Sequence, residues 1–261
     1  MKKIFIFLAG IFLLVPFAKA QDSSLYEKHL FLQNGDTMPY RILLPLNFDV
    51  HKKYPLVLFL HGSGERGNDN EKQLVHGGNL FLTDSIRKNY PAIVVFPQCA
   101  NTSFWSNIGF HYDSATKKET IEFKEDGEPT QAMKLLMRLF KKLEKDYRLD
   151  DKRLYAGGLS MGGMGTFELV RRMPSTFAAA FAICGGADTA TSQQMSKTAW
   201  WIFHGLKDNV VDPQFSRDMA EALKKAGAEV KLTLYPEDGH NSWDDSFKEP
   251  ELFVWMFSHK R

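Results

Sequence analysis

The sequence predicts an α/β fold, a doubly wound and mostly parallel sheet with an antiparallel hairpin at its N-terminal edge. From Leu56 onward, short apolar runs alternate with helical patterns, as expected when crossover helices join parallel strands. Before them, the turn signal Asn34-Gly35-Asp36 separates two further runs and predicts the hairpin. Helices should cover both faces of such a sheet.

The expected strands follow one another in chain order. The hairpin takes His29–Leu32 and Tyr40–Leu44. The parallel strands are apolar runs at Leu56–Leu60, Ile93–Phe96, Leu154–Ala156, Ala178–Cys184, Trp200–Phe203 and Val230–Tyr235. Each run is short and apolar, which is typical of a strand buried on both sides.

Three helices have clear signals. Between Thr130 and Tyr147, apolar residues recur at helical spacing while Lys and Arg occupy the other face. Asp212-Pro213 supplies an N-cap and a proline at the first helical position, and Gly227 can end that helix. A last helix is expected at Pro250–His259.

Residues 1–20 have the pattern of a secretory signal peptide. Met1-Lys2-Lys3 is basic, Ile4–Phe17 is apolar, and Ala18-Lys19-Ala20 ends the segment with small residues. The apolar run is short for a membrane span and is interrupted by Pro16, so cleavage is favoured over anchoring. We therefore expect a secreted or periplasmic protein with no stable membrane anchor.

The charge, length and cysteine content of the chain limit which partners and which fold stabilisation are expected. The chain has 33 Lys and Arg against 31 Asp and Glu, but three of the lysines lie in residues 1–20. The remainder, 21–261, is nearly neutral and long enough for a single domain. No basic stripe interleaved with aromatics is present, which argues against nucleic acid as a partner. Cys99 and Cys184 are too few for a disulfide framework and are expected as buried thiols.

A nucleophile is predicted where a strand turns sharply into a helix. Gly158-Leu159-Ser160-Met161-Gly162 has the G-x-S-x-G pattern and stands directly between an apolar strand and a helical segment. A serine on such a turn has strained backbone angles, and the two outer glycines remove side chains that would collide. The spacing fits neither a phosphate-binding loop nor a dinucleotide-binding fingerprint.

A serine hydroxyl needs a base, and the base needs an acid to orient it. His240 follows the strand Val230–Tyr235, and Asp208 follows the strand Trp200–Phe203. Loops after parallel strands lie at one edge of the sheet, so both residues should meet Ser160 there. Asp188 is an alternative acid, because it also follows a strand.

Two backbone N–H groups are expected to stabilise the oxyanion. One belongs to Met161, the residue after the nucleophile. The other belongs to the glycine-rich loop after the first parallel strand, where Ser63 is preferred and Gly62 and Gly64 are alternatives.

The segment Asn101–Glu128 lacks clear periodicity and mixes aromatic with charged residues. It follows a parallel strand, where a ligand-facing loop belongs. The sequence leaves open whether it is a small cap over the site or a surface excursion. Because this aromatic segment follows a parallel strand, we expect Trp105 to bind the substrate.

With these motifs in this order, the chain resembles the α/β-hydrolase carboxylesterases, and more narrowly the feruloyl and acetyl-xylan esterases and polyhydroxybutyrate-depolymerase-like proteins. The resemblance rests on His61-Gly62-Ser63-Gly64, the segment around Ser160, His204-Gly205 with Asp208, and Gly239-His240. It implies hydrolysis of carboxylic esters through an acyl-enzyme, with no metal and no organic cofactor. The complete set of serine, histidine and acid, the export signal and the aromatic segment near Trp105 favour a small-molecule or polysaccharide-linked ester as the substrate. The chain departs from dienelactone hydrolases, whose nucleophile is cysteine where this chain has Ser160.

Two other functions compete with an esterase. A prolyl-oligopeptidase-like peptidase would use the same nucleophile, but such enzymes usually carry a propeller domain that this chain lacks. A binding protein that retains only the fold would not need the complete set of serine, histidine and acid.

Overall fold

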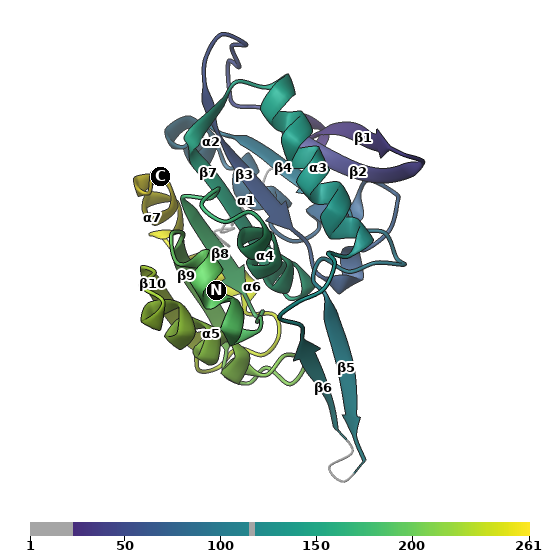
Figure 1. Ribbon diagram of the computed structural model, residues 1–261. Helices are drawn as coiled ribbons and strands as arrows, with labels where there is room; N and C mark the ends of the chain where they lie inside the picture. Colours follow the sequence, from purple (N-terminus) through teal and green to yellow (C-terminus); the bar gives the residue numbers. More distant parts are fainter. Residues whose placement is uncertain (1–22, 115–117) are drawn as a thin grey trace, which may run out of the picture.

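The computed structural model describes residues 23–114 and 118–261 (Figure 1). The expected signal peptide at residues 1–20 lies outside the described residues. An eight-stranded sheet forms the centre of the molecule, with the strand order β1-β2-β4-β3-β7-β8-β9-β10. The strands are β1 (Glu27–Gln33), β2 (Asp36–Leu43), β3 (Tyr54–Leu60), β4 (Ile93–Pro97), β7 (Leu149–Leu159), β8 (Ala179–Ile183), β9 (Ala199–Gly205) and β10 (Val230–Tyr235).

The predicted parallel sheet and edge hairpin are both confirmed. β4, β3, β7, β8, β9 and β10 pair in parallel, and β2 pairs antiparallel with β4. β1 pairs antiparallel with β2 across the two-residue turn Asn34-Gly35, whose φ angles are 54° and 85°. Both angles are positive, as this tight type of hairpin turn requires.

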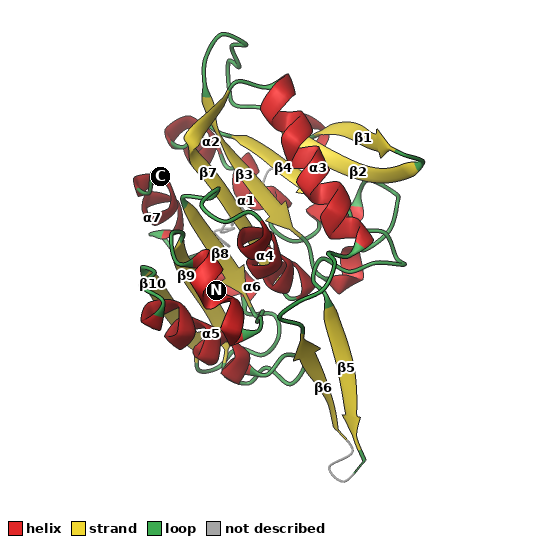
Figure 2. Cartoon of the chain, in the orientation of Figure 1, coloured by secondary structure: helices red, strands yellow, loops and turns green. Residues whose placement is uncertain are grey.

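Helices cover both faces of the sheet (Figure 2). One layer contains α3 (Gln131–Asp146), α4 (Met161–Arg172) and α5 (Pro213–Lys225), and the other contains α1 (Gly78–Leu82), α2 (Asp84–Asn89) and α7 (Leu252–Ser258). A short helix, α6 (Trp243–Ser246), follows β10. The predicted doubly wound arrangement is therefore confirmed.

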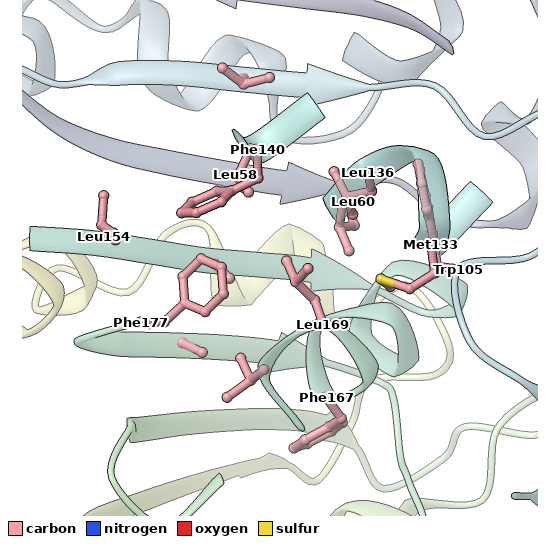
Figure 3. Packing of buried hydrophobic residues seen from close by; sticks show 14 of the residues in the cluster. Leu58, Leu60, Trp105, Met133, Leu136, Phe140, Leu154, Phe167, Leu169 and Phe177 are labelled. Carbon is pink, nitrogen blue, oxygen red and sulfur yellow. The ribbon is translucent and has the colours of Figure 1, made fainter. Parts of the chain in front are cut away.

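The sheet has a separate hydrophobic core on each face. On one face, side chains of α3 and α4 pack onto β3 and β7, and Figure 3 shows Leu136, Phe140 and Leu169 pointing toward Leu58 and Leu60. On the other face, side chains from α1 and α7 pack against the aromatic residues of β3 and β9. Apolar residues on both sides of each strand thus account for the continuous apolar runs in the sequence.

The N-termini of α3 and α5 are capped by the residues that the sequence predicts. The Thr130 side chain accepts a hydrogen bond from the Met133 N–H at 3.2 Å, and Asp212 accepts one from the Gln214 N–H at 2.8 Å. Pro213 occupies the first turn of α5. Within residues 23–114 and 118–261, no helix combines the length and apolar character needed to cross a membrane.

The segment 101–128 contains a β-hairpin arm. Its strands β5 (Ile108–Asp113) and β6 (Lys118–Phe123) pair with each other outside the main sheet, and the arm projects from the body of the molecule (Figure 1). Its base is attached to α5, because the rings of Phe123 and Phe215 pack edge to face with centroids 5.0 Å apart. Phe110 and Tyr112 on β5 are exposed.

β3, β7 and α4 approach one another so closely that only glycine fits at their junction. A Cβ atom on Gly162 would collide with the Leu60 carbonyl oxygen, and one on Gly158 would collide with the Gly162 carbonyl. These contacts are between backbone atoms, which cannot rotate away as a flexible side chain can.

We expect Gly162→Ala to lower the free energy of unfolding by at least about 2 kcal/mol, because the added methyl overpacks a backbone junction. Gly64→Ala is the matched control, since a Cβ there meets nothing within 4 Å. Urea denaturation of both variants measures the difference. Equal stability of the two variants would show that the junction can relax.

Candidate active site

Ser160 lies at the sharp turn between β7 and α4. Its backbone has φ 53° and ψ −120°, a strained conformation for a residue with a side chain. The Ser160 N–H donates to the Ile183 carbonyl at 2.8 Å, which ties the turn to the end of β8. The surrounding sheet thus stabilises this strained backbone conformation. Ser160 is nearly buried, with 8% of its surface exposed.

The structure brings Ser160, His240 and Asp208 together as the sequence predicts. The Ser160 hydroxyl oxygen is 2.9 Å from His240 Nε2, and His240 Nδ1 is 2.7 Å from Asp208 Oδ2. Asp208 follows β9 and His240 follows β10, so both loops lie beyond the carboxyl ends of neighbouring parallel strands. The arrangement can transfer a proton from the hydroxyl to the imidazole while the carboxylate orients the ring.

The Asp208 carboxylate is buried and fully hydrogen-bonded. Oδ1 accepts from the Val210 and Val211 N–H groups at 2.8 and 3.0 Å, and Oδ2 contacts both His240 and His204. Burial alone would raise the pKa of this carboxyl, but the bonds from His204, His240 and the two backbone N–H groups outweigh it. The pKa of Asp208 is therefore held well below its ordinary value, and the group is an anion at neutral pH.

The backbone N–H groups of Met161 and Ser63, the two expected oxyanion donors, each stand at the start of a separate helical segment near the nucleophile. Met161 is the first residue of α4, and Ser63 is the first residue of the 3₁₀ turn η2 (Ser63–Glu65). The first N–H groups of a helix have no acceptor inside it and are free to bind an anion. A Cβ added to Gly62 would lie 3.7 Å from the Ser160 Cβ, which places this loop against the nucleophile.

Comparison with known proteins identifies the family. A family model described as phospholipase/carboxylesterase matches residues 49–256. The chain belongs to this family of α/β-hydrolase carboxylesterases. It shares 31% identity and a TM-score of 0.81 with the crystal structure of a thermostable esterase, covering 92% of this chain and 64% of the other.

The chain also resembles more distant proteins in sequence or in fold. The chain is 26% identical over 191 residues to the probable feruloyl esterase C of Aspergillus terreus, covering 72% of this chain and 62% of that protein. It therefore spans less than two thirds of that relative. The acylaminoacyl peptidase of Pyrococcus horikoshii aligns with a TM-score of 0.60 and 17% identity, covering 90% of this chain and 42% of the peptidase.

Asp188, the alternative acid of this family member, has a different role in the structure. Its side chain accepts a hydrogen bond from the Ala190 N–H at 2.9 Å and caps the 3₁₀ helix η4 (Thr189–Met195). Asp208, in contrast, contacts the His240 ring directly. The geometry favours Asp208 over Asp188.

His61 is a buried histidine that supports the loop after β3, which contains Gly62 and Ser63. Its Nδ1 lies 2.6 Å from the Gly62 carbonyl, and its Nε2 accepts from the Cys99 N–H at 2.9 Å. Nδ1 therefore carries the proton, and a second proton on Nε2 would face an N–H donor. Burial lowers the pKa of His61 to about 4. The glycine after His61 indicates a turn, but the sequence gives no signal for the Cys99 contact.

The assignment of Trp105 to substrate binding is wrong. Its side chain is fully buried in the core, and its indole N–H donates to the His61 carbonyl at 3.2 Å. Its ring packs edge to face on the His61 ring, with centroids 5.3 Å apart. Trp105 anchors the loop after β3 through the His61 carbonyl and is not accessible to a substrate.

A cleft of about 550 Å³ lies beside the acid of the site. It is lined by Thr120, Ile121, Asp208, Asn209, Val210, Asp212, Pro213 and Phe215. One wall is strand β6 of the arm, and the other consists of the loop that carries Asp208 and the start of α5. Ser160 and His240 do not line this cleft. A larger hollow of about 830 Å³ lies between β1 and α3, but none of Ser160, Asp208 and His240 lines it.

Cys184 lies beside the site, and both cysteines are buried free thiols as predicted. Potential ligand atoms of Cys184, Asp208 and His240 lie within 4.8 Å of one another. A metal would need the thiolate, yet burial raises the pKa of the Cys184 thiol well above its ordinary value. Asp208 and His240 already bind each other, so their geometry suits proton transfer better than metal binding.

We expect Asp208→Asn to lower kcat for ester hydrolysis by about 10³-fold or more, because the amide favours the wrong His240 tautomer. Asp188→Asn is the control and should retain wild-type kcat. Steady-state kinetics on a short-chain p-nitrophenyl ester measures both. A large loss in Asp188→Asn with little change in Asp208→Asn would reverse the assignment of the acid.

The free energy of unfolding should decrease as the pH is lowered from about 6.5 to 4, because His61 is neutral in the folded state. In that window the unfolded chain binds a proton on His61 and the folded chain does not, so the free energy of unfolding rises with pH. The shift corresponds to roughly 3 kcal/mol across the window. Urea denaturation at several pH values should give a flatter dependence for His61→Gln than for the wild type. An unchanged slope would contradict the neutral assignment.

Proposed function

We propose that this protein is a serine esterase that hydrolyses carboxylic esters of small or carbohydrate-linked acyl groups. The observation that carries the proposal is the continuous contact from the Ser160 hydroxyl through His240 to the Asp208 carboxylate, at 2.9 and 2.7 Å. Ser160 would be the nucleophile, His240 the general base and Asp208 the orienting acid. Membership of the carboxylesterase family supports the same chemistry.

In the first half of the reaction, Ser160 Oγ attacks the ester carbonyl while His240 Nε2 takes the hydroxyl proton. The negative charge that develops on the carbonyl oxygen would be stabilised by the N–H groups of Met161 and Ser63. Asp208 stabilises the imidazolium that forms, and remains ionised itself. When the C–O bond breaks, His240 returns its proton to the departing alcohol, which leaves the acyl group on Ser160.

In the second half, water attacks the acyl-enzyme. His240 takes a proton from the water, the same two N–H groups stabilise the second oxyanion, and the proton then passes to Ser160 Oγ as the acid leaves. Each step uses only groups of the chain, the ester substrate and water. The mechanism therefore requires no metal ion and no organic cofactor.

We assign a compact acyl or alcohol group to the cleft beside Asp208, which adjoins the acid of the site but is lined by neither Ser160 nor His240. Ile121, Val210 and Phe215 supply apolar surface, while Asp212 and Asn209 supply polar groups. Its volume of about 550 Å³ falls in the ordinary range of small-molecule sites. The resemblance to a fungal feruloyl esterase supports a carbohydrate-linked ester as the natural substrate.

We propose export for the same protein, because residues 1–20 have a basic start, an apolar run and a small-residue end. Cleavage after Ala20 would release residues 21–261 to the periplasm or the medium. Polysaccharide-linked esters are encountered there.

We expect Ser160→Ala to reduce hydrolysis of p-nitrophenyl acetate by about 10⁵-fold or more, because it removes the hydroxyl that contacts His240 Nε2. The wild type, and not the variant, should be labelled by a fluorophosphonate probe. Lack of labelling in a folded wild type would favour a binding protein.

A substrate panel then separates esterase from peptidase. The wild type should hydrolyse acetylated xylan or feruloyl esters faster than proline-containing peptides. Faster cleavage of the peptides would replace the proposal with the peptidase alternative, since the same fold occurs in an acylaminoacyl peptidase.

A further inference from the structure

A second histidine contacts the same carboxylate oxygen as His240. His204 Nε2 lies 3.2 Å from Asp208 Oδ2 and 3.0 Å from the Val211 carbonyl oxygen. The His204 side chain is fully buried at the end of β9, four residues before Asp208. It does not contact the nucleophile, so the reaction described above leaves it without a role.

The partners of His204 determine which ring nitrogen carries a proton. The ionised Asp208 carboxylate and the Val211 carbonyl can only accept hydrogen bonds. Because both face Nε2, that nitrogen must carry a proton and donate it. The single Nε2–H of His204 is thus shared between the Val211 carbonyl at 3.0 Å and Asp208 Oδ2 at 3.2 Å, and it supplies Oδ2 with a donor in addition to His240 Nδ1.

The other side of the His204 ring is anchored in α5. Nδ1 lies 2.7 Å from the hydroxyl oxygen of Ser216, which is fully buried, and Ser216 Oγ lies 2.9 Å from the Gly185 carbonyl oxygen. The ring is therefore held at both nitrogens by groups from different segments of the chain. It cannot turn without breaking buried hydrogen bonds, which makes it a rigid support.

We propose that His204 is a positioning residue of this esterase, whose Nε2–H holds Asp208 Oδ2 at the angle that orients His240. The inference rests on the proposed function. Oδ1 is fixed by the backbone N–H groups of Val210 and Val211, but Oδ2 also has to meet the His240 ring. With His204 present, both oxygens have a donor independent of His240, so the carboxylate plane stays in place when His240 gains and loses its proton.

Removal of the donor should affect the chemical step more than binding. We expect His204→Leu to lower kcat by about tenfold to a hundredfold with little change in KM, because a small displacement of the base is costly. His204→Gln should recover much of the loss, since its side-chain amide can place an N–H near the position of Nε2. Steady-state kinetics on p-nitrophenyl acetate measures both variants.

A spectroscopic signature reports on the Asp208–His240 pair without requiring turnover. The proton on His240 Nδ1, bonded to a carboxylate at 2.7 Å, should give a far-downfield ¹H resonance. We expect this resonance to shift or broaden in His204→Leu and to return toward the wild-type position in His204→Gln. Its assignment is checked by its loss in His240→Ala.

Two further variants separate positioning from general destabilisation. Ser216→Ala keeps His204 but removes its anchor, and should lower kcat several-fold and shift the same resonance, so it tests the proposal even where His204→Leu does not fold. Thr198→Val is the control, because Thr198 is buried in the turn before β9 and its hydroxyl donates to the Phe177 carbonyl at 3.0 Å. It should lower the melting temperature while leaving kcat and the resonance unchanged.

Folded His204→Leu and Ser216→Ala with wild-type kcat and an unshifted resonance would overturn the inference. Equal losses of kcat in His204→Leu and His204→Gln, with the resonance in place, would also overturn it. Failure of the proposed function is distinguishable, because the wild type would then hydrolyse no ester. The His240 resonance would in that case still decide whether His204 positions Asp208.

Discussion

The backbone contact between Gly162 and Leu60 is the constraint on which the site depends. It brings the start of α4 against the end of β3, with no side chain between the two segments. That approach leaves Ser160 on a turn with φ 53° and places the free N–H groups of α4 beside the loop after β3. The strained turn and the proposed oxyanion donors therefore arise from one packing requirement.

A second requirement concerns the buried charge of Asp208. An ionised carboxylate in the protein interior is stable only when its oxygens are hydrogen-bonded. Here two backbone N–H groups and two imidazoles surround it. The loop after β9 supplies two of these donors, His204 at the end of β9 supplies a third, and His240 reaches the carboxylate from the loop after β10.

The β5–β6 arm sets the environment of the cleft. Its base packs on α5 through Phe123 and Phe215, and Thr120 and Ile121 form a wall beside Asp208. The aperiodic sequence of residues 101–128 indicated a ligand-facing loop after β4, and the base of the arm lies at that position. Its strands were not recognisable, because an isolated pair of strands lacks the regular alternation imposed by a buried sheet face.

Local sequence determined the parallel strands, the edge hairpin and the G-x-S-x-G turn, because each depends on neighbouring residues whose periodicity or conformational freedom is visible in the chain. Chain order and strand ends were enough to place Asp208 and His240 near Ser160. Tertiary structure alone decided the rest. His61 and His204 both precede glycine at a strand end, yet one contacts Cys99 and the other contacts Asp208. Trp105 likewise contacts His61, a residue 44 positions earlier in the chain. Such contacts join residues far apart in the chain, so only folding determines them.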